Sequence, residues 1–182
     1  MTEDPPRPLP DLLAPGLRAI FCGLNPGLRA AAGGHHFEGR QNRFWPVLHR
    51  AGFTPRLLAP HEDRVLLDGG YGLTTVVARP TAGARELSRA EYRAAAEALA
   101  RKVARLHPRC IAFLGKAAYA AISGRRSVEW GDQAARFGGA RVWVLPNPSG
   151  LNRGFDLDAL VAAYRELRVA LEAPSSASRV PR

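Results

Sequence analysis

The chain has 182 residues, of which 46% are apolar and 23% are charged, a mixture typical of a folded protein and not of a disordered one. No apolar run approaches the 18 residues that a membrane span requires, so no membrane partner is expected. The two cysteines, Cys22 and Cys110, are too few for a four-cysteine metal or iron–sulfur site, and they favour a reducing, cytoplasmic location.

The charge balance gives the first indication of a partner. Lys and Arg number 26 against 16 Asp and Glu, which leaves a formal net charge of +10. A chain this basic is attracted to polyanions, of which nucleic acid is the most common. Arginine and alanine enrichment would also follow from a GC-rich genome, so the charge alone leaves the partner open.

Short β-rich runs alternate with longer segments of helical period. Strands are expected at residues 17–24, 72–78, 109–115 and 142–146. Helices are expected at residues 42–52, 88–107, from Lys116 for a short distance, and at 156–171. Ser88 and Glu91 have capping-box spacing, Gly52 is a plausible C-cap, and Asp156 could cap the last helix.

This alternation predicts an α/β fold, a three-layer α/β/α arrangement with a small, mostly parallel four-stranded sheet. One domain is expected over residues 11–173, with a flexible N-terminus at 1–10 and a flexible, small and polar tail at 174–182. Ligands of such sheets bind beyond the carboxyl ends of the strands. The site is therefore expected among the turns that follow the first, third and fourth predicted strands.

Five short motifs carry a family resemblance. They are GLNPG (23–27), NRFW (42–45), RPT (79–81), FLGK (113–116) and LPNPSGL (145–151). In this order they resemble the mismatch-specific uracil/thymine DNA glycosylases, the branch of the uracil-DNA glycosylase superfamily that attacks bases opposite guanine. The similarity runs from about residue 15 to 171 and includes weaker matches at 49–56 and 163–167.

The resemblance implies a uracil-DNA glycosylase-like fold and a base-excision repair hydrolase. Such an enzyme flips the target nucleotide out of the duplex, which costs least for a mispaired base. Water then attacks the sugar and the base departs, leaving an abasic site with no metal or organic cofactor. No lysine occupies a plausible nucleophile position, so a monofunctional enzyme is expected.

The resemblance gives the water-positioning role to Asn25, with Gly23 and Leu24 as substrate-binding neighbours. Gly27 would let backbone N–H groups approach the base or a phosphate. Because an amide oxygen orients water but is a poor base, slow turnover is expected. The alternative is an Asn-Pro-Gly turn that only ends a strand.

Asp68 is a candidate general base that would assist Asn25. The alternative is a turn residue held by local hydrogen bonds. The remaining carboxylates between the first two predicted strands, Glu38, Glu62 and Asp63, are expected to be solvated.

Phe37 matches the aromatic residue that stacks on the flipped base in this family. Its neighbours His35 and His36 look more like the eukaryotic thymine-glycosylase form of the loop, so the pocket could also accept thymine or ethenocytosine. A solvated histidine pair with no role is the alternative.

The 145–153 segment would form the second side of the pocket. Asn147 matches a residue that donates to the uracil carbonyl, and Leu151 matches the apolar wedge that enters the base stack. The expected DNA contacts of this segment are Ser149, Gly150, Leu151, Asn152 and Arg153, with Arg153 donating to the widowed guanine. Leu151 could instead be a surface-loop residue or the first core residue of the last helix.

Lys116 follows Gly115 at the start of a predicted helix, where a helix N-terminus and one ammonium make a phosphate clamp. The Walker pattern is absent, and a solvated lysine is the alternative.

The expected function is removal of uracil, with thymine and ethenocytosine as further candidates, from G·U or G·T mismatches in double-stranded DNA by a monomer in the bacterial cytoplasm. Two alternatives remain. One is a catalytically silent DNA-binding module, which the weak chemistry of Asn25 would fit. The other is a nucleotide hydrolase or transferase, which would need acidic metal ligands that the 23–27 turn lacks.

Overall fold

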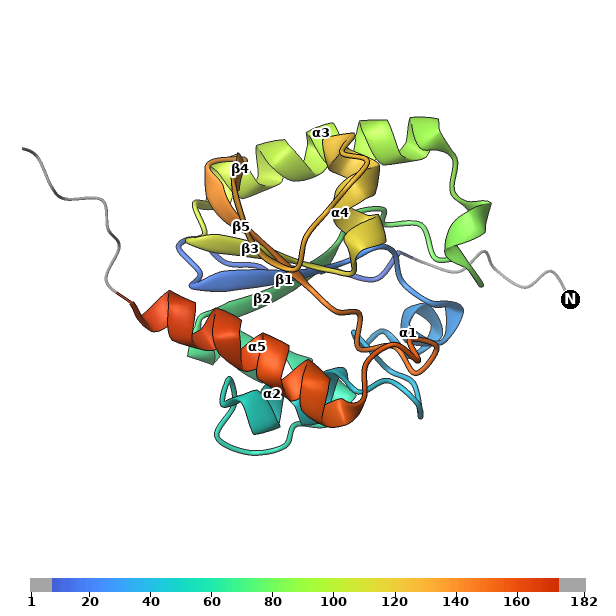
Figure 1. Cartoon of the computed structure of the whole chain (residues 1–182). Helices are drawn as coiled ribbons and strands as arrows, with labels where there is room; N and C mark the ends of the chain where they lie inside the picture. The colour runs from blue at the N-terminus through green and yellow to red at the C-terminus, as the bar shows by residue number, and fades with distance from the viewer. Residues whose placement is uncertain (1–7, 174–182) are drawn as a thin grey trace, which may run out of the picture.

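A five-stranded sheet forms the centre of the computed structural model, which describes residues 8–173 (Figure 1). The strand order is β2-β1-β3-β5-β4. The strands are β1 (Ala19–Gly23), β2 (Tyr71–Thr75), β3 (Cys110–Leu114), β4 (Gly131–Phe137) and β5 (Ala140–Leu145). The first four strands in that order are parallel and β4 is antiparallel to β5. The predicted α/β class with a mostly parallel sheet is confirmed.

The fifth strand, β4, was not expected from the sequence. It contains Asp132, Gln133 and Arg136 and lies at the edge of the sheet, where only alternate residues are half-buried. Its register with β5 is interrupted between Asp132 and Arg136, and Ala134 in this interval has a φ of 49°. A polar, irregular edge strand lacks the continuous apolar run that reveals the buried parallel strands.

Four helices confirm the predicted segments to within about two residues, and the short helix at Leu28–Gly33 was not predicted. The helices are α1 (Leu28–Gly33), α2 (Phe44–Ala51), α3 (Arg89–Leu106), α4 (Lys116–Ser123) and α5 (Leu157–Glu172), with 3-10 segments at Pro60–Gly69 and Ala84–Glu86. The Ser88–Glu91 capping box, the Asp156 cap and the left-handed Gly52 C-cap are all present.

The two faces of the sheet bury separate apolar clusters. Helices α2 and α5 cover one face, where Phe21 contacts the rings of Phe44, Phe53 and Tyr164. Helices α3 and α4 cover the other face and pack on residues such as Phe113 (Figure 1). Strands β1, β3 and β5 are neighbours in the parallel part of the sheet. The turns that follow them, where the site is predicted, therefore lie at one edge.

The segment before β1 is part of the folded structure. Leu9 is buried, and Leu12 exchanges two backbone hydrogen bonds with Leu73 along the outer edge of β2. The prediction that residues 1–10 are flexible is therefore wrong for Leu9 and Pro10, because an apolar side chain and a carbonyl there have partners in the fold. Residues 1–7 and 174–182, the remainder of the predicted flexible ends, lie outside the described residues.

Within residues 8–173, no helix is long and apolar enough to span a membrane. In the same part of the chain, no group of three or more His, Cys, Asp and Glu side chains is arranged to hold a metal ion.

Candidate active site

Asn25 lies immediately beyond the carboxyl end of β1, and its amide orientation is fixed by its surroundings. Its Nδ2 donates to Thr81 Oγ1 at 2.6 Å and to the carbonyl oxygens of Arg79 and Pro26, both at 3.3 Å. Two of these partners are carbonyls, which can only accept, so the NH₂ group must face them. The Oδ1 atom therefore points away from this cluster and is available to accept a hydrogen bond from water.

The RPT motif explains why Asn25 is held so tightly. Thr81 is buried and donates onward to the Gly83 carbonyl at 3.0 Å, so its hydroxyl is oriented to accept from Asn25. Arg79 supplies its carbonyl to Asn25 while its guanidinium binds Glu91 on α3 and the Glu86 carbonyl. The motif connects the β1 turn to the start of α3.

Phe37 forms a wall beside the carboxyl end of β1. Its ring stacks on Phe44 with centroids 3.9 Å apart, and its φ of 57° is unusual for a bulky residue. A Cβ added to Gly23 would lie 3.9 Å from the Phe37 ring, which places the ring beside the strand end. Leu24 is partly buried and packs against the apolar cluster beneath α3 and α4.

A buried carboxylate anchors the loop that carries Phe37. Asp63 is 4% exposed, accepts from the backbone N–H of His36 at 3.3 Å, and lies 3.4 Å from His35 Nδ1. His36 is also buried, with its Nε2 2.8 Å from the Pro10 carbonyl oxygen. The expectation that Asp63 is solvated is wrong, because its side chain is buried and hydrogen-bonded. The alternative of a solvated histidine pair is wrong for His36, which is also buried and hydrogen-bonded.

The NRFW motif connects the two sides of the predicted pocket. Asn42 Oδ1 accepts from the N–H of Phe44, the first residue of α2. Phe44 stacks on Phe37, and Trp45 Nε1 donates to the His36 carbonyl. Arg43 turns the other way, toward the 148–155 loop. Its guanidinium donates to the carbonyls of Phe155 at 2.6 Å, Ser149 and Asn152 at 2.9 Å each, and Pro148 at 3.3 Å.

The loop after β5 presents Asn147 and Leu151 to solvent. Asn147 Oδ1 accepts from the Ser149 N–H, and its Nδ2 lies over Gly115, 3.8 Å from where a Cβ would be. Asn152 donates to the Asn147 carbonyl, so it stabilises the loop internally. Leu151 is 87% exposed, which is incompatible with the alternative of a first core residue of α5.

A cleft of about 430 Å³ lies beside Leu151 and includes Arg29 and Arg40 in its lining. Gly150 packs so closely here that a Cβ would lie 2.5 Å from the Gln41 Cβ and 2.7 Å from its carbonyl oxygen. Arg153 is exposed, and around Gly27 there is open space for a ligand to approach the backbone.

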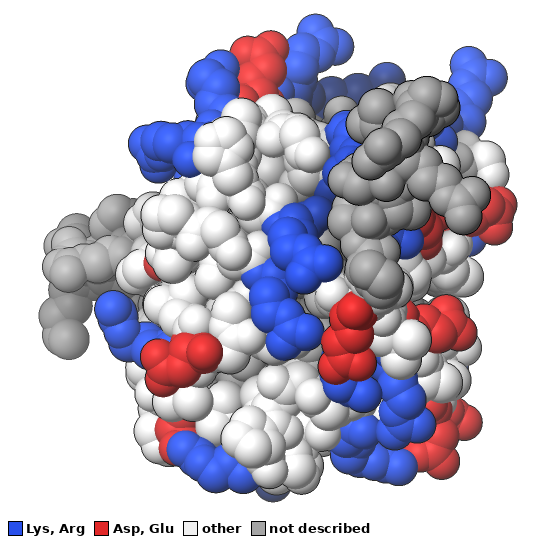
Figure 2. All heavy atoms as spheres, turned by 90° about the vertical axis from the view of Figure 1, so that its left-hand side faces the viewer, with Lys and Arg blue, Asp and Glu red and all other residues white. Residues whose placement is uncertain are grey.

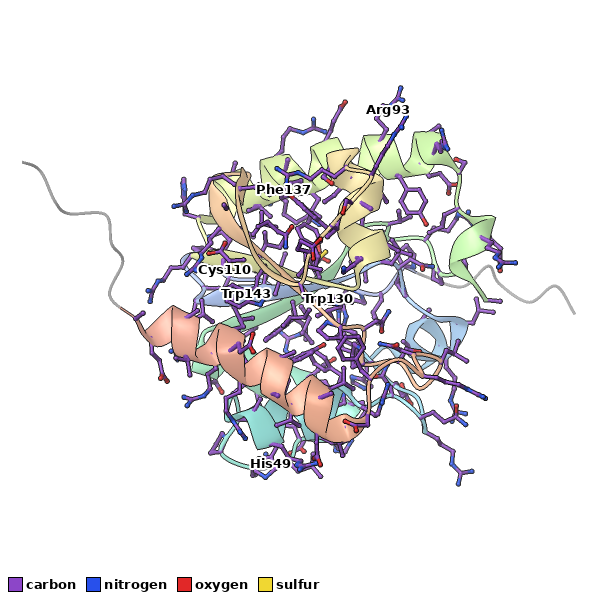
Figure 3. The ribbon with its side chains drawn as sticks, viewed as in Figure 1. His49, Arg93, Cys110, Trp130, Phe137 and Trp143 are labelled. Atoms are coloured by element: carbon purple, nitrogen blue, oxygen red, sulfur yellow. The ribbon has the colours of Figure 1, made fainter. Side chains whose placement is uncertain are left out.

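Lys116 begins α4 at the same edge, but its ammonium already has an aromatic partner. Its Nζ lies 4.7 Å from the centroid of the Trp130 ring, which in turn contacts Phe155 edge-on at 5.3 Å. Trp130 is 42% exposed and lies near the base of α4 (Figure 3). The phosphate-binding role of Lys116 stays a prediction, now with Trp130 as a positioning partner.

Asp68 does not lie near Asn25. It precedes Tyr71, the first residue of β2, which pairs with Ala19, the first residue of β1. Asn25 follows the last residue of β1, so five strand residues, about 16 Å, separate the two ends. The hypothesis of assistance from Asp68 is wrong, because an aspartate ahead of a parallel strand lies at the opposite edge of the sheet.

Comparison with known proteins identifies the family and the fold. The model of the uracil DNA glycosylase superfamily matches residues 10–168. The fold is similar to the solution NMR structure of a candidate uracil DNA glycosylase from Methanosarcina acetivorans, with a TM-score of 0.62 and 21% identity over 90% of this chain and 98% of that chain. Since the family model spans nearly all of the described residues, the chain belongs to the uracil DNA glycosylase superfamily.

Proposed function

We propose that this protein removes uracil, and with a wider pocket thymine or ethenocytosine, from mismatches with guanine in double-stranded DNA by hydrolysis. The observation that carries the proposal is the fixed orientation of Asn25. With its Nδ2 held by three oxygens, its Oδ1 can accept a hydrogen bond from a water and aim the water at the sugar carbon.

The flipped base would stack on the face of Phe37 that Phe44 does not cover. Stacking on an aromatic ring contributes about 1–3 kcal/mol and tolerates several bases. Asn147 Nδ2 would donate to a base carbonyl, which stabilises the departing anion. The exposed Leu151 would fill the space that the base leaves in the stack.

We further propose a monofunctional reaction by a monomer. Water adds to the sugar carbon as the C1′–N1 bond breaks, the base leaves as an anion that takes up a proton, and the product is an abasic site. Lys116 stands against Trp130, so the proposal gives it a phosphate contact and no covalent role.

The test is single-turnover base release from G·U, G·T, A·U and single-stranded uracil substrates. N25A is expected to release uracil at least about 100-fold more slowly than the wild type, the low end of what a positioned acid–base group contributes. N25D is expected to be slower than the wild type too, because a carboxylate cannot donate to the carbonyls of Arg79 and Pro26.

The matched control is Q133A, which removes an amide from the edge strand β4. It is expected to leave the rate unchanged. Release that survives N25A would refute the role of Asn25, and DNA binding without release from any substrate would favour a catalytically silent DNA-binding module.

A further inference from the structure

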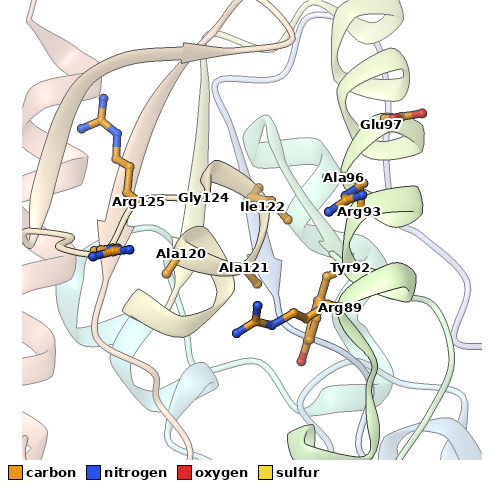
Figure 4. A pocket seen from close by; sticks show the side chains of 11 residues that line it. Arg89, Tyr92, Arg93, Ala96, Glu97, Ala120, Ala121, Ile122, Gly124 and Arg125 are labelled. Carbon is orange, nitrogen blue, oxygen red and sulfur yellow. The ribbon is translucent and has the colours of Figure 1, made fainter.

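A groove lined by four arginines lies between the first turns of α3 and the end of α4, outside the candidate active site. Its volume is about 770 Å³. Arg89 and Arg93 come from α3, and Arg125 and Arg126 follow the C-cap of α4. Figure 4 shows Arg89 and Arg93 on one side of the groove and Arg125 on the other.

The positive charge of this groove is not neutralised within residues 8–173. Six arginines elsewhere in this part of the chain have acidic partners, for example Arg56 with Glu62 and Arg141 with Asp132. The four groove arginines are exposed and form no ion pair with a described residue. The one acid of the lining, Glu97, lies 4.0 Å from Arg101 instead.

An uncompensated cluster of this kind costs free energy. Arg89 and Arg93 are four residues apart on one helix face, where like charges destabilise the helix. A bound anion would relieve this repulsion. The helix surfaces between the arginines carry Ala96, Ala120 and Ala121, small side chains that allow a polymer backbone to approach closely.

The groove is joined to the Asn25 turn through Arg79. The Arg79 carbonyl accepts from Asn25, while its guanidinium holds Glu91 in the first turn of α3, between Arg89 and Arg93. Helix α4 connects the groove to Lys116 and spans about 12 Å. This length is well under the 34–36 Å of one turn of DNA, so the groove lies within one turn of Lys116.

The face at the opposite edge of the sheet has a different character. This face, at the left of Figure 1, shows Asp and Glu side chains interspersed among Lys and Arg (Figure 2). The arginine groove lacks such compensation, which favours a regular polyanion as its ligand over an ordinary solvated surface.

We infer that the arginine groove binds backbone phosphates of the duplex that flanks the lesion, as a second, sequence-independent DNA contact. This inference rests on the proposed function to the extent that both require duplex DNA as a ligand. The contact adds affinity for long duplexes and leaves the chemistry at Asn25 unchanged.

The experiment measures binding of an undamaged duplex of about 30 base pairs as a function of salt. The groove variant is R93Q/R125Q, and the matched control is R105Q/R109Q, which removes the same charge from exposed arginines at the amino edge of the sheet, just before β3. Each phosphate contact contributes about −0.9 to the log–log salt slope. The groove variant is therefore expected to reduce the slope for this duplex by about 1.8, with a much smaller change for the control.

Equal slopes for the groove and control variants would overturn the inference. Base release from a short G·U duplex, measured on the same proteins, separates the two proposals. Wild-type protein that releases no uracil would refute the proposed function, whereas the slopes on undamaged DNA decide the groove independently.

Discussion

Arg43 is the residue whose loss tests the architecture of the candidate site most directly. Its guanidinium forms three hydrogen bonds of 2.6–2.9 Å and one of 3.3 Å with carbonyls between residues 148 and 155. A hydrogen bond to a charged group contributes about 1.5–3 kcal/mol. Because water reaches several of these half-exposed carbonyls once the side chain is removed, we expect R43A to lose about 2–4 kcal/mol and not the full sum.

This energy orders the loop that carries Leu151, so it should be visible in base release. A loss of about 2.7 kcal/mol corresponds to a 100-fold slower single-turnover rate. R43K keeps the charge but lacks the planar fork, and it is expected to restore only part of the rate. R136A removes an exposed arginine from the edge strand β4 and serves as a control with a rate close to that of the wild type.

A double-mutant cycle with L151A shows whether Arg43 acts through the wedge loop. Residues that act as one unit are not additive, so R43A/L151A is expected to be little slower than the slower single variant. Urea unfolding measures the stability of each protein, and L151A is expected to be as stable as the wild type because Leu151 is 87% exposed. Additive rate effects, or an R43A rate within threefold of the wild type, would refute the reasoning.

Two further predictions concern buried titratable groups. Burial lowers the pKa of His36 below its usual 6.5, against the opposing effects of the Pro10 carbonyl and the carboxylates of Asp63 and Asp11. The unfolded chain therefore binds more protons than the folded one below about pH 6.5, so the unfolding free energy is expected to fall from pH 7 to pH 5. H36Q should flatten this profile in urea titrations at several pH values, and an unchanged slope would contradict the assignment. Burial also raises the pKa of Cys22, and raises that of Cys110 to about 12. At pH 8 a thiol reagent is expected to modify neither in the folded protein and both in urea, whereas modification without denaturant would show that the sheet opens there.

The fold was predictable where local signals and burial agree. Strands β1, β3 and β5 are almost entirely buried on both faces, so their sequences are continuous apolar runs. The caps at Ser88 and Asp156 mark helix starts by their own hydrogen bonds. Strand β4 was missed because pairing with β5, and not its own apolar content, keeps it in the sheet.

The motifs of the candidate site can be read from the sequence, but the contacts between them cannot. Spacing in the sequence placed Asn25 and Leu151 at one edge, yet it gave no sign that Thr81 orients the Asn25 amide or that Arg43 holds the Leu151 loop. These contacts join segments more than 50 residues apart, and a polar residue within a motif does not reveal its partner. Nothing in the sequence indicates that Asp63 is buried, because its burial depends on how the 35–37 loop packs over it.

The two outer strands of the sheet have a consequence for how copies of this protein behave at high concentration. The exposed side of β2 is covered by the segment around Leu12, whose backbone takes up both hydrogen-bonding groups of Leu73. The other outer strand, β4, is irregular between Asp132 and Arg136 and carries the Asp132–Arg141 ion pair. Coverage, irregularity and charge are the features that prevent strands of separate molecules from pairing into aggregates. A basic protein that crowds along one polyanion would benefit from this protection, since its neighbours are brought together by their common ligand and not by contacts of their own.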